Sequence, residues 1–177
     1  MDDRELALGL RAGNPEAVRL FVQRFQDDLF RLCARLLHNR HDAEDVVQEV
    51  LVRAIRGIGN FDLDRPFRPW LTRIAINRCR TQLATRSRRP ELLEIGELCP
   101  DPRPSLADAD DLAGELDRAL EQLRPEYREV FLMFHQQALP YEEISRVIDR
   151  PVGTVKTWLH RARAELADRL QRKGVLE

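Results

Sequence analysis

The chain has 177 residues, of which 43% are hydrophobic and 33% are charged, and its formal net charge at pH 7 is −1. This length and composition are typical of a soluble globular protein with one or two small domains. The sequence has no apolar run of about 18 residues and no charged-then-apolar leader. We therefore expect neither membrane insertion nor secretion, and we predict a cytoplasmic location.

The cysteines argue against a disulfide framework or a zinc ribbon, because there are three of them and they lack CxxC spacing. Cys33 and Cys79 are predicted to be small core residues, and Cys99 a free thiol. Cys33, His38 and His41 could be drawn together as metal ligands, but such a trio without further support is usually structural. We predict no metal and no other cofactor.

The first clear helix is predicted to start at "NPEAVRLFVQRF", with Asn14 as the cap and Pro15 in the first turn. Its apolar stripe has the 3.6-residue period of a buried helix face and comprises Val18, Phe21, Phe25, Leu29, Leu32 and Leu36.

The next helix contains "DAEDVVQEV", a segment with four acids and no base. Asp42 stands at the position of an N-cap. The inward face is predicted to comprise Ala43, Val46, Val47, Val50, Leu51 and Ala54, while Asp45, Gln48 and Glu49 face outward. The pattern alone fits a merely solvated charged face equally well.

Two glycines and a proline in "RGIGNFDLDRPF" predict a loop, and a further helix follows it. In that helix we expect Arg73, Asn77 and Arg80 to face outward. The residues expected to face inward are Leu71, Ile74, Ala75, Cys79 and Leu83.

The charges are sorted along the chain. Residues 65–89 carry eight arginines and no acid, whereas residues 90–117 carry nine acids and one arginine, with four prolines at the start of this block. Residues 151–177 are again basic, with six bases and three acids. The pattern predicts two basic modules that meet phosphate, joined by an acidic linker. One hypothesis is that this linker lies over the arginine-rich helix, and a plain solvated spacer is the alternative.

The last predicted helix pair has the spacing of a helix-turn-helix motif. An earlier helix in this module begins near Pro125. The pair breaks at Asp149-Arg150-Pro151, and its inward residues are Ile144, Val147, Ile148, Val155, Leu159, Ala162 and Leu166. Thr157, His160, Arg161 and Ala164 are placed on the opposite face, with Lys156 and Arg163 on its flank. Such side chains can read base edges and hold phosphates.

Three segments carry a family resemblance: "DAEDVVQEVLVRAIR", "FRPWLTRIAINRCRTQL" and "YEEISRVIDRPVGTVKTWLHRARAEL". The chain resembles a bacterial extracytoplasmic-function (ECF) sigma factor of RNA polymerase. The resemblance implies an all-α fold with two small helical domains, region 2 in residues 1–89 and region 4 in residues 111–177, joined by a flexible linker over residues 90–110. Asp149 replaces a common turn glycine, Pro140 a usual Ser or Thr cap, and Trp158 a frequent arginine.

The resemblance also implies the partners, which are core RNA polymerase through its β′ clamp helices and β flap, and promoter DNA. Sequestration is frequent in the family, which makes an anti-sigma factor a candidate partner. The implied polymerase contacts are Asp45, Gln48 and Glu49. The implied −10 DNA contacts are Asn60, Phe61, Asp62, Arg65, Phe67, Trp70, Arg73, Asn77 and Arg80. The implied −35 DNA contacts are Thr154, Lys156, Thr157, His160, Arg161 and Arg163.

Three alternatives remain open at this stage. Trp70 could stack on a base or belong to the core, and aromatic residues at helix starts are more often core. A helix-turn-helix regulator acting without polymerase would leave the acidic helix and the arginine block without a role. A nuclease using Asp42, Glu44 and Asp45 with a metal lacks a complete site, so no enzyme activity is predicted.

Overall fold

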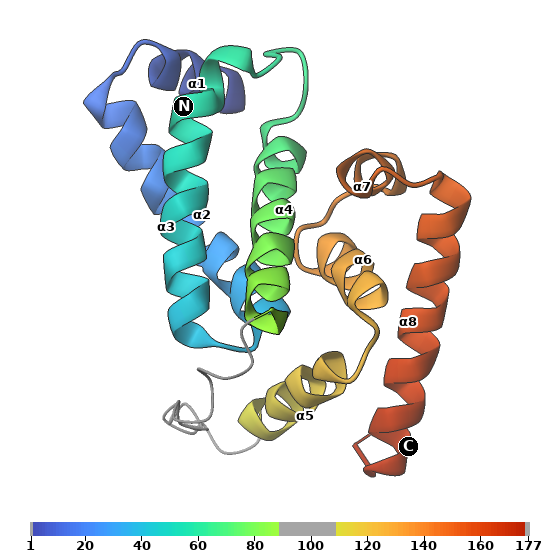
Figure 1. Ribbon diagram of the computed structural model, residues 1–177. Coiled ribbons are helices and arrows are strands. Elements are labelled where there is room, and N and C mark those ends of the chain that lie inside the picture. The colour runs from blue at the N-terminus through green and yellow to red at the C-terminus, as the bar shows by residue number, and fades with distance from the viewer. Residues whose placement is uncertain (1, 89–108, 176–177) are drawn as a thin grey trace.

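The computed structural model describes residues 2–88 and 109–175, which form an all-helical protein (Figure 1). The elements are α1 (Asp3–Arg11), α2 (Pro15–Leu37), α3 (Arg40–Gly57), the 3-10 turn η1 (Ile58–Asn60), α4 (Phe67–Ser87), α5 (Ala109–Glu121), α6 (Pro125–His135), α7 (Tyr141–Ile148) and α8 (Val152–Arg172). The predicted fold class is therefore confirmed. α5 begins within the stretch that was expected to be linker.

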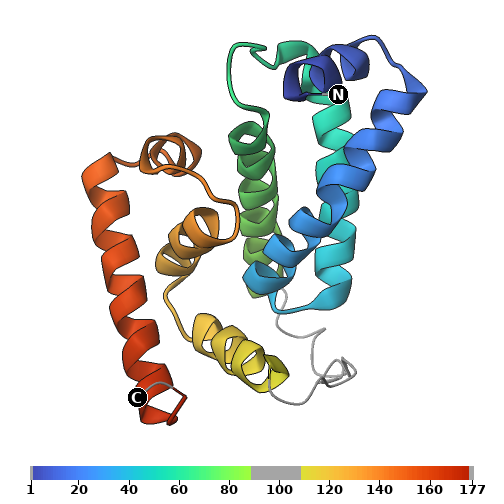
Figure 2. The ribbon, with the colours of Figure 1, turned by 180° about the vertical axis from the view of Figure 1, so that it is seen from behind.

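The N-terminal module is built on α2, α3 and α4, which pack side by side (Figures 1 and 2). They bury the predicted stripe of α3 and that of α2 except Val18, which is half-buried. Asn14 caps α2 as predicted, because its side chain accepts a hydrogen bond from the Glu16 amide. The prediction that Asp42 is the N-cap of α3 is wrong. Asn39 caps this helix, and its side chain accepts from the Asp42 amide at 2.9 Å. The Asp42 carboxylate instead accepts from Gln82 on α4 at 3.0 Å.

Helix α1 was missed by the sequence reasoning, although Asp2 and Glu5 form a capping box at its start. Its residues Leu6, Ala7 and Leu10 are buried against the rest of the module. α1 and α2 approach so closely that a Cβ on Gly9 would lie 2.7 Å from the Ala17 Cβ. A glycine at that position is therefore required by the packing.

The C-terminal module consists of α5 to α8, with α7 and α8 forming the helix-turn-helix (Figure 2). All seven residues predicted to face inward on this pair are buried. Asp149 is the C-cap of α7 and adopts the left-handed conformation with φ 55°, at the position where the family commonly has glycine. The Ser145 hydroxyl donates to the Arg150 carbonyl at 2.5 Å, which ties the turn to the helix before it.

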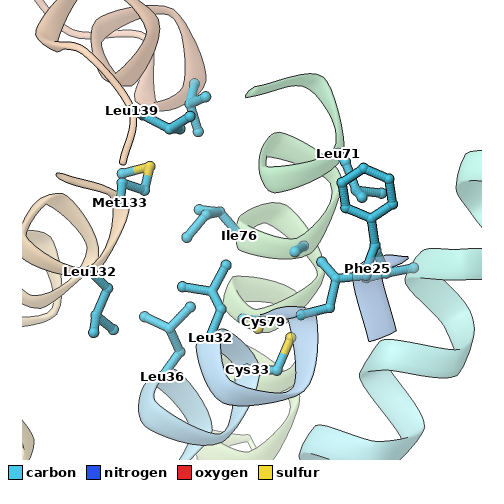
Figure 3. Packing of buried hydrophobic residues seen from close by; sticks show 14 of the residues in the cluster. Phe25, Leu32, Cys33, Leu36, Leu71, Ile76, Cys79, Leu132, Met133 and Leu139 are labelled. Carbon is cyan, nitrogen blue, oxygen red and sulfur yellow. The ribbon is translucent and has the colours of Figure 1, made fainter. Parts of the chain in front are cut away.

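The two modules pack on each other and share one hydrophobic cluster. Figure 3 shows Leu32 and Leu36 of α2 and Ile76 of α4 facing Leu132, Met133 and Leu139 from the C-terminal module, and all six are buried. Cys33 and Cys79 are buried in the same cluster, as predicted. The prediction that Leu83 faces inward is wrong, because its relative exposure is 36% near the end of α4.

Polar contacts surround this apolar junction. The Arg35 guanidinium lies 2.9 Å from both the Asp117 carboxylate and the Gln136 side-chain oxygen. His38 Nδ1 lies 3.2 Å from a Glu121 carboxylate oxygen, while Arg128 contacts the other ring nitrogen. Burial, and secondly the Arg128 charge, lower the pKa of His38 from 6.5, and the nearby carboxylate only partly opposes this shift.

Residues 90–108 of the predicted linker, which include Cys99, lie outside the described residues, so the linker hypothesis is not addressed by the structure. Within the described ranges, every helix is too short or too polar to cross a membrane.

Candidate nucleic-acid and partner-binding interfaces

The outer face of α3 presents two of the three predicted polymerase contacts freely. Asp45 and Gln48 are exposed. Glu49 is half-buried and forms a two-point ion pair with Arg78 of α4, one contact of which measures 2.8 Å. The hydrogen bond from Arg78 is the main cause that lowers the pKa of Glu49. Glu49 therefore joins α3 to α4 as well as lying on the candidate surface.

The loop between α3 and α4 is supported from beneath by an aromatic cluster. Phe67 is fully buried, and its ring centroid lies 5.3 Å from those of both Phe61 and Trp70. Phe61 is only 4% exposed. The ring of Phe67 is therefore part of the core that shapes the loop and has no exposed surface with which to contact DNA in this conformation. The ring of Phe61 packs in the same cluster, and its predicted contact with DNA stays a prediction. Trp70 is half-buried and packs on both rings, which favours the core alternative for it.

The loop keeps its other predicted residues at the surface, where Asn60, Asp62 and Arg65 are exposed. Arg11 of α1, which sequence reasoning missed, anchors the loop from behind. Its guanidinium donates to the Ile58 carbonyl at 3.0 Å and also to that of Phe61. No sequence motif marked this role, because it depends on where α1 lies in space.

A pocket of about 340 Å³ opens beside this loop. The loop and α4 line one wall, and Glu143, Arg146 and Val147 of α7 line the other. The loop and α4 residues of the pocket are Asn60, Phe61, Asp62, Arg65, Pro66, Pro69, Trp70 and Arg73. Six of the nine residues predicted to contact −10 DNA thus line one cavity, which the C-terminal module completes.

Further along α4, Asn77 and Arg80 share the outward side with Arg73, as predicted, and all three are exposed. Arg80 is nevertheless engaged. Its guanidinium donates to both carboxylate oxygens of Glu129 on α6, at 2.8 and 2.5 Å. This hydrogen bonding is the main cause that raises the pKa of Arg80.

The outer face of α8 carries the predicted base-reading and phosphate-binding side chains. Thr154 is half-buried, and the exposed members of this set are Lys156, Thr157, His160, Arg161 and Arg163. Neighbouring helices support two of the guanidinium groups: Arg161 lies 3.2 Å from the Tyr127 hydroxyl, and Arg163 lies 3.1 Å from His135 Nε2. Supported but exposed cations can bind phosphate with little loss of side-chain entropy.

The fold and these surfaces define a helix-turn-helix transcription protein with a second basic module at its N-terminus. Comparison with known families gives two matches, to sigma-70 region 2 over residues 21–89 and to sigma-70 region 4 over residues 113–166. The chain is 31% identical to the RNA polymerase sigma-H factor of Pseudomonas aeruginosa, over 96% of this chain and 94% of that protein. It is also 31% identical to the ECF sigma factor SigW of Bacillus subtilis, over 92% and 93% of the two chains.

Solved structures agree with these matches. The structure of CnrH in complex with the cytosolic domain of CnrY superposes with a TM-score of 0.74 at 27% identity, covering 96% of this chain and 97% of CnrH. The sigma factor RpoE of Bartonella quintana, in complex with the anti-sigma factor NepR, has the same fold, with a TM-score of 0.71 at 23% identity, over 85% of this chain and 96% of RpoE. The chain belongs to the extracytoplasmic-function sigma factors of bacterial RNA polymerase.

Proposed function

We propose that this sigma factor divides its work among three surfaces. The outer face of α3, with Asp45, Gln48 and Glu49, binds the clamp helices of polymerase. The loop before α4 and the outward row Arg73, Asn77 and Arg80 bind the unwound −10 strand. The outer face of α8 reads the −35 element as duplex.

The observation that carries this proposal is the outer face of α8. Thr157, His160 and Arg161 are exposed opposite the buried stripe of this helix, and Lys156 and Arg163 are exposed on the flank. A helix with this arrangement, placed second in a helix-turn-helix, fits the major groove and can contact both bases and phosphates. Acids are repelled by phosphate, which supports assigning the exposed acids of α3 to a protein surface.

Run-off transcription with bacterial core polymerase over a genomic promoter library tests this function. We expect specific transcripts only when the protein and the core enzyme are both present. Failure to obtain any specific transcript with competent core, together with repression by the protein alone through DNA occupancy, would instead support a regulator that acts without polymerase.

Sigma factors are not enzymes, and we infer that this chain has no catalytic activity of its own and acts in the cytoplasm, where polymerase and promoters are. CnrH, which this chain resembles along almost its whole length, forms a complex with the cytosolic domain of a second protein. We therefore also infer an anti-sigma protein as a regulatory partner. Co-purification of the tagged chain from its host before and after envelope stress tests that inference.

A further inference from the structure

In the described conformation, the C-terminal module lies beside the surface proposed for −10 DNA and contacts it at two places. α6 and α7 lie beside α4, on the side away from α3 (Figures 1 and 2). At one end α7 forms a wall of the pocket beside the loop. At the other end the Glu129 carboxylate occupies the Arg80 guanidinium through two hydrogen bonds. One cation of this surface, Arg80, is therefore occupied from within the same chain, while the other polar residues of the surface remain exposed.

The Glu129 contact has the geometry that a phosphate would use. Two carboxylate oxygens accept two N–H groups of one guanidinium, which is the arrangement that arginine also forms with phosphate. The side chain of Glu129 is only 10% exposed, whereas that of Arg80 is 43% exposed. The acid is thus held in place by α6 and presents a fixed substitute for a DNA phosphate.

The apolar junction makes this arrangement more than a loose electrostatic contact. Leu36, Ile76 and Leu132 are among the large apolar side chains buried where the modules meet (Figure 3). Separating the modules would expose them to water, which is unfavourable. Binding partners must therefore supply the free energy of opening.

Promoter geometry requires such an opening. The two elements lie about 25 base pairs apart, which is about 85 Å along B-form DNA. A compact chain of this size is only about 40 Å across. The closed protein cannot reach both elements at once, so a transcribing sigma factor must separate its modules.

We propose that Glu129 acts as an intramolecular competitor of DNA, which keeps the free sigma factor from binding −10 strands until polymerase separates the modules. This inference rests on the proposed role of Arg80 as a −10 contact. The contact between Glu129 and Arg80 joins the modules. Two further contacts of an acid with a basic side chain also join them, those of Asp117 with Arg35 and of Glu121 with His38.

The test compares Glu129→Gln with Glu126→Gln in the full-length protein. Glu126 is an exposed acid on the same helix, and it acts on the pKa of Arg80 only through its charge. Glu126→Gln is therefore the control, because it removes the same charge as Glu129→Gln. The probe is a fluorescein-labelled single strand that carries the −10 sequence of a promoter found by the run-off screen. Affinity is measured for free protein across a salt series, and circular dichroism checks that both variants fold.

We expect Glu129→Gln to bind the strand about three- to tenfold more tightly than Glu126→Gln, because it releases a charge-assisted contact. The gain should shrink as salt rises. It should disappear in the Arg80→Ala background and also in the polymerase holoenzyme, where the modules are already apart. Equal affinities of the two folded variants, or a gain that persists without Arg80 or within the holoenzyme, would overturn the proposal.

A separate measurement distinguishes failure of the proposed function. If holoenzyme with Arg80→Ala initiates transcription as well as the unaltered holoenzyme, Arg80 is not a −10 contact. In that case the role that the proposed function gives to Arg80 is wrong. Small-angle X-ray scattering of free protein addresses the closed arrangement by itself. A radius of gyration of about 16 Å is expected for a compact chain of this length with closed modules, and a clearly larger value would contradict the closed arrangement.

Discussion

Replacing Phe67 by Ala should destabilise the protein strongly, because this residue is at the centre of the aromatic cluster and not at the DNA surface. Its ring is fully buried and lies 5.8 Å from Phe21 and 5.4 Å from Phe25, measured between centroids, in addition to its contacts with Phe61 and Trp70. Truncation of a buried Phe costs about 3–5 kcal/mol. Four aromatic neighbours favour the upper half of that range, so we expect a loss of about 4 kcal/mol.

Because the modules share one hydrophobic cluster, we expect them to unfold together. For a domain of this size, 1 kcal/mol shifts the Tm by about 2–4 °C, so the Phe67→Ala variant should melt about 8–16 °C lower in calorimetry. Asn60→Ala, in the exposed part of the same loop, is the control and should change stability by less than about 0.5 kcal/mol while weakening −10 binding. An unchanged Tm for Phe67→Ala combined with a loss of −10 affinity would refute this reasoning and return Phe67 to the DNA surface.

Three further expectations separate the surfaces. Asp45→Arg should abolish core binding in a pull-down without lowering the Tm, whereas Glu49→Arg should also cost about 1–3 kcal/mol of stability because it leaves Arg78 without its partner. Arg161→Ala should leave core binding unchanged and weaken binding to DNA with the preferred −35 sequence by about 1–3 kcal/mol. If binding assays show equal losses at every −35 sequence, Arg161 is a phosphate contact and does not read a base. Because the closed modules lower the pKa of His38, they favour its neutral form, so the junction should be strongest above pH 6.5 and weaken as pH falls below 6.5. Scattering at pH 5.5 and 7.5 measures the opening, and His38→Gln should remove the pH dependence.

The helix-turn-helix shows what sequence reasoning captured well. All seven positions that its apolar spacing predicted to face inward are buried, although the buried Leu170 near the end of α8 was not predicted, and Asp149 was placed correctly at the left-handed turn. The outward directions of Asp45, Gln48 and Arg161 followed from the same periodicity. These features depend on residues only a few positions apart in one helix, and that spacing fixes which side chains share a face.

The aromatic loop and the paired charges show where local patterns were insufficient. Phe61 and Phe67 were assigned to DNA by resemblance, but Phe21 and Phe25 of α2 enclose Phe67, from more than 40 residues away in the chain. Asp42 was expected to cap α3, yet Asn39 holds that position. Periodicity states that a residue faces inward or outward on its own helix, and it contains no information about which other helix lies there.

The sequence by itself determined the helices after α1, the turn between α7 and α8 and the chemistry of each outer face, because periodicity and residue type act over a few residues. Only the tertiary structure decided that the two modules bury a common junction and that Glu129 takes the hydrogen bonds of Arg80. Those contacts join residues 49 positions apart. Their geometry depends on how whole helices pack, which is set by side-chain shape across the junction and not by the order of residues within any one helix.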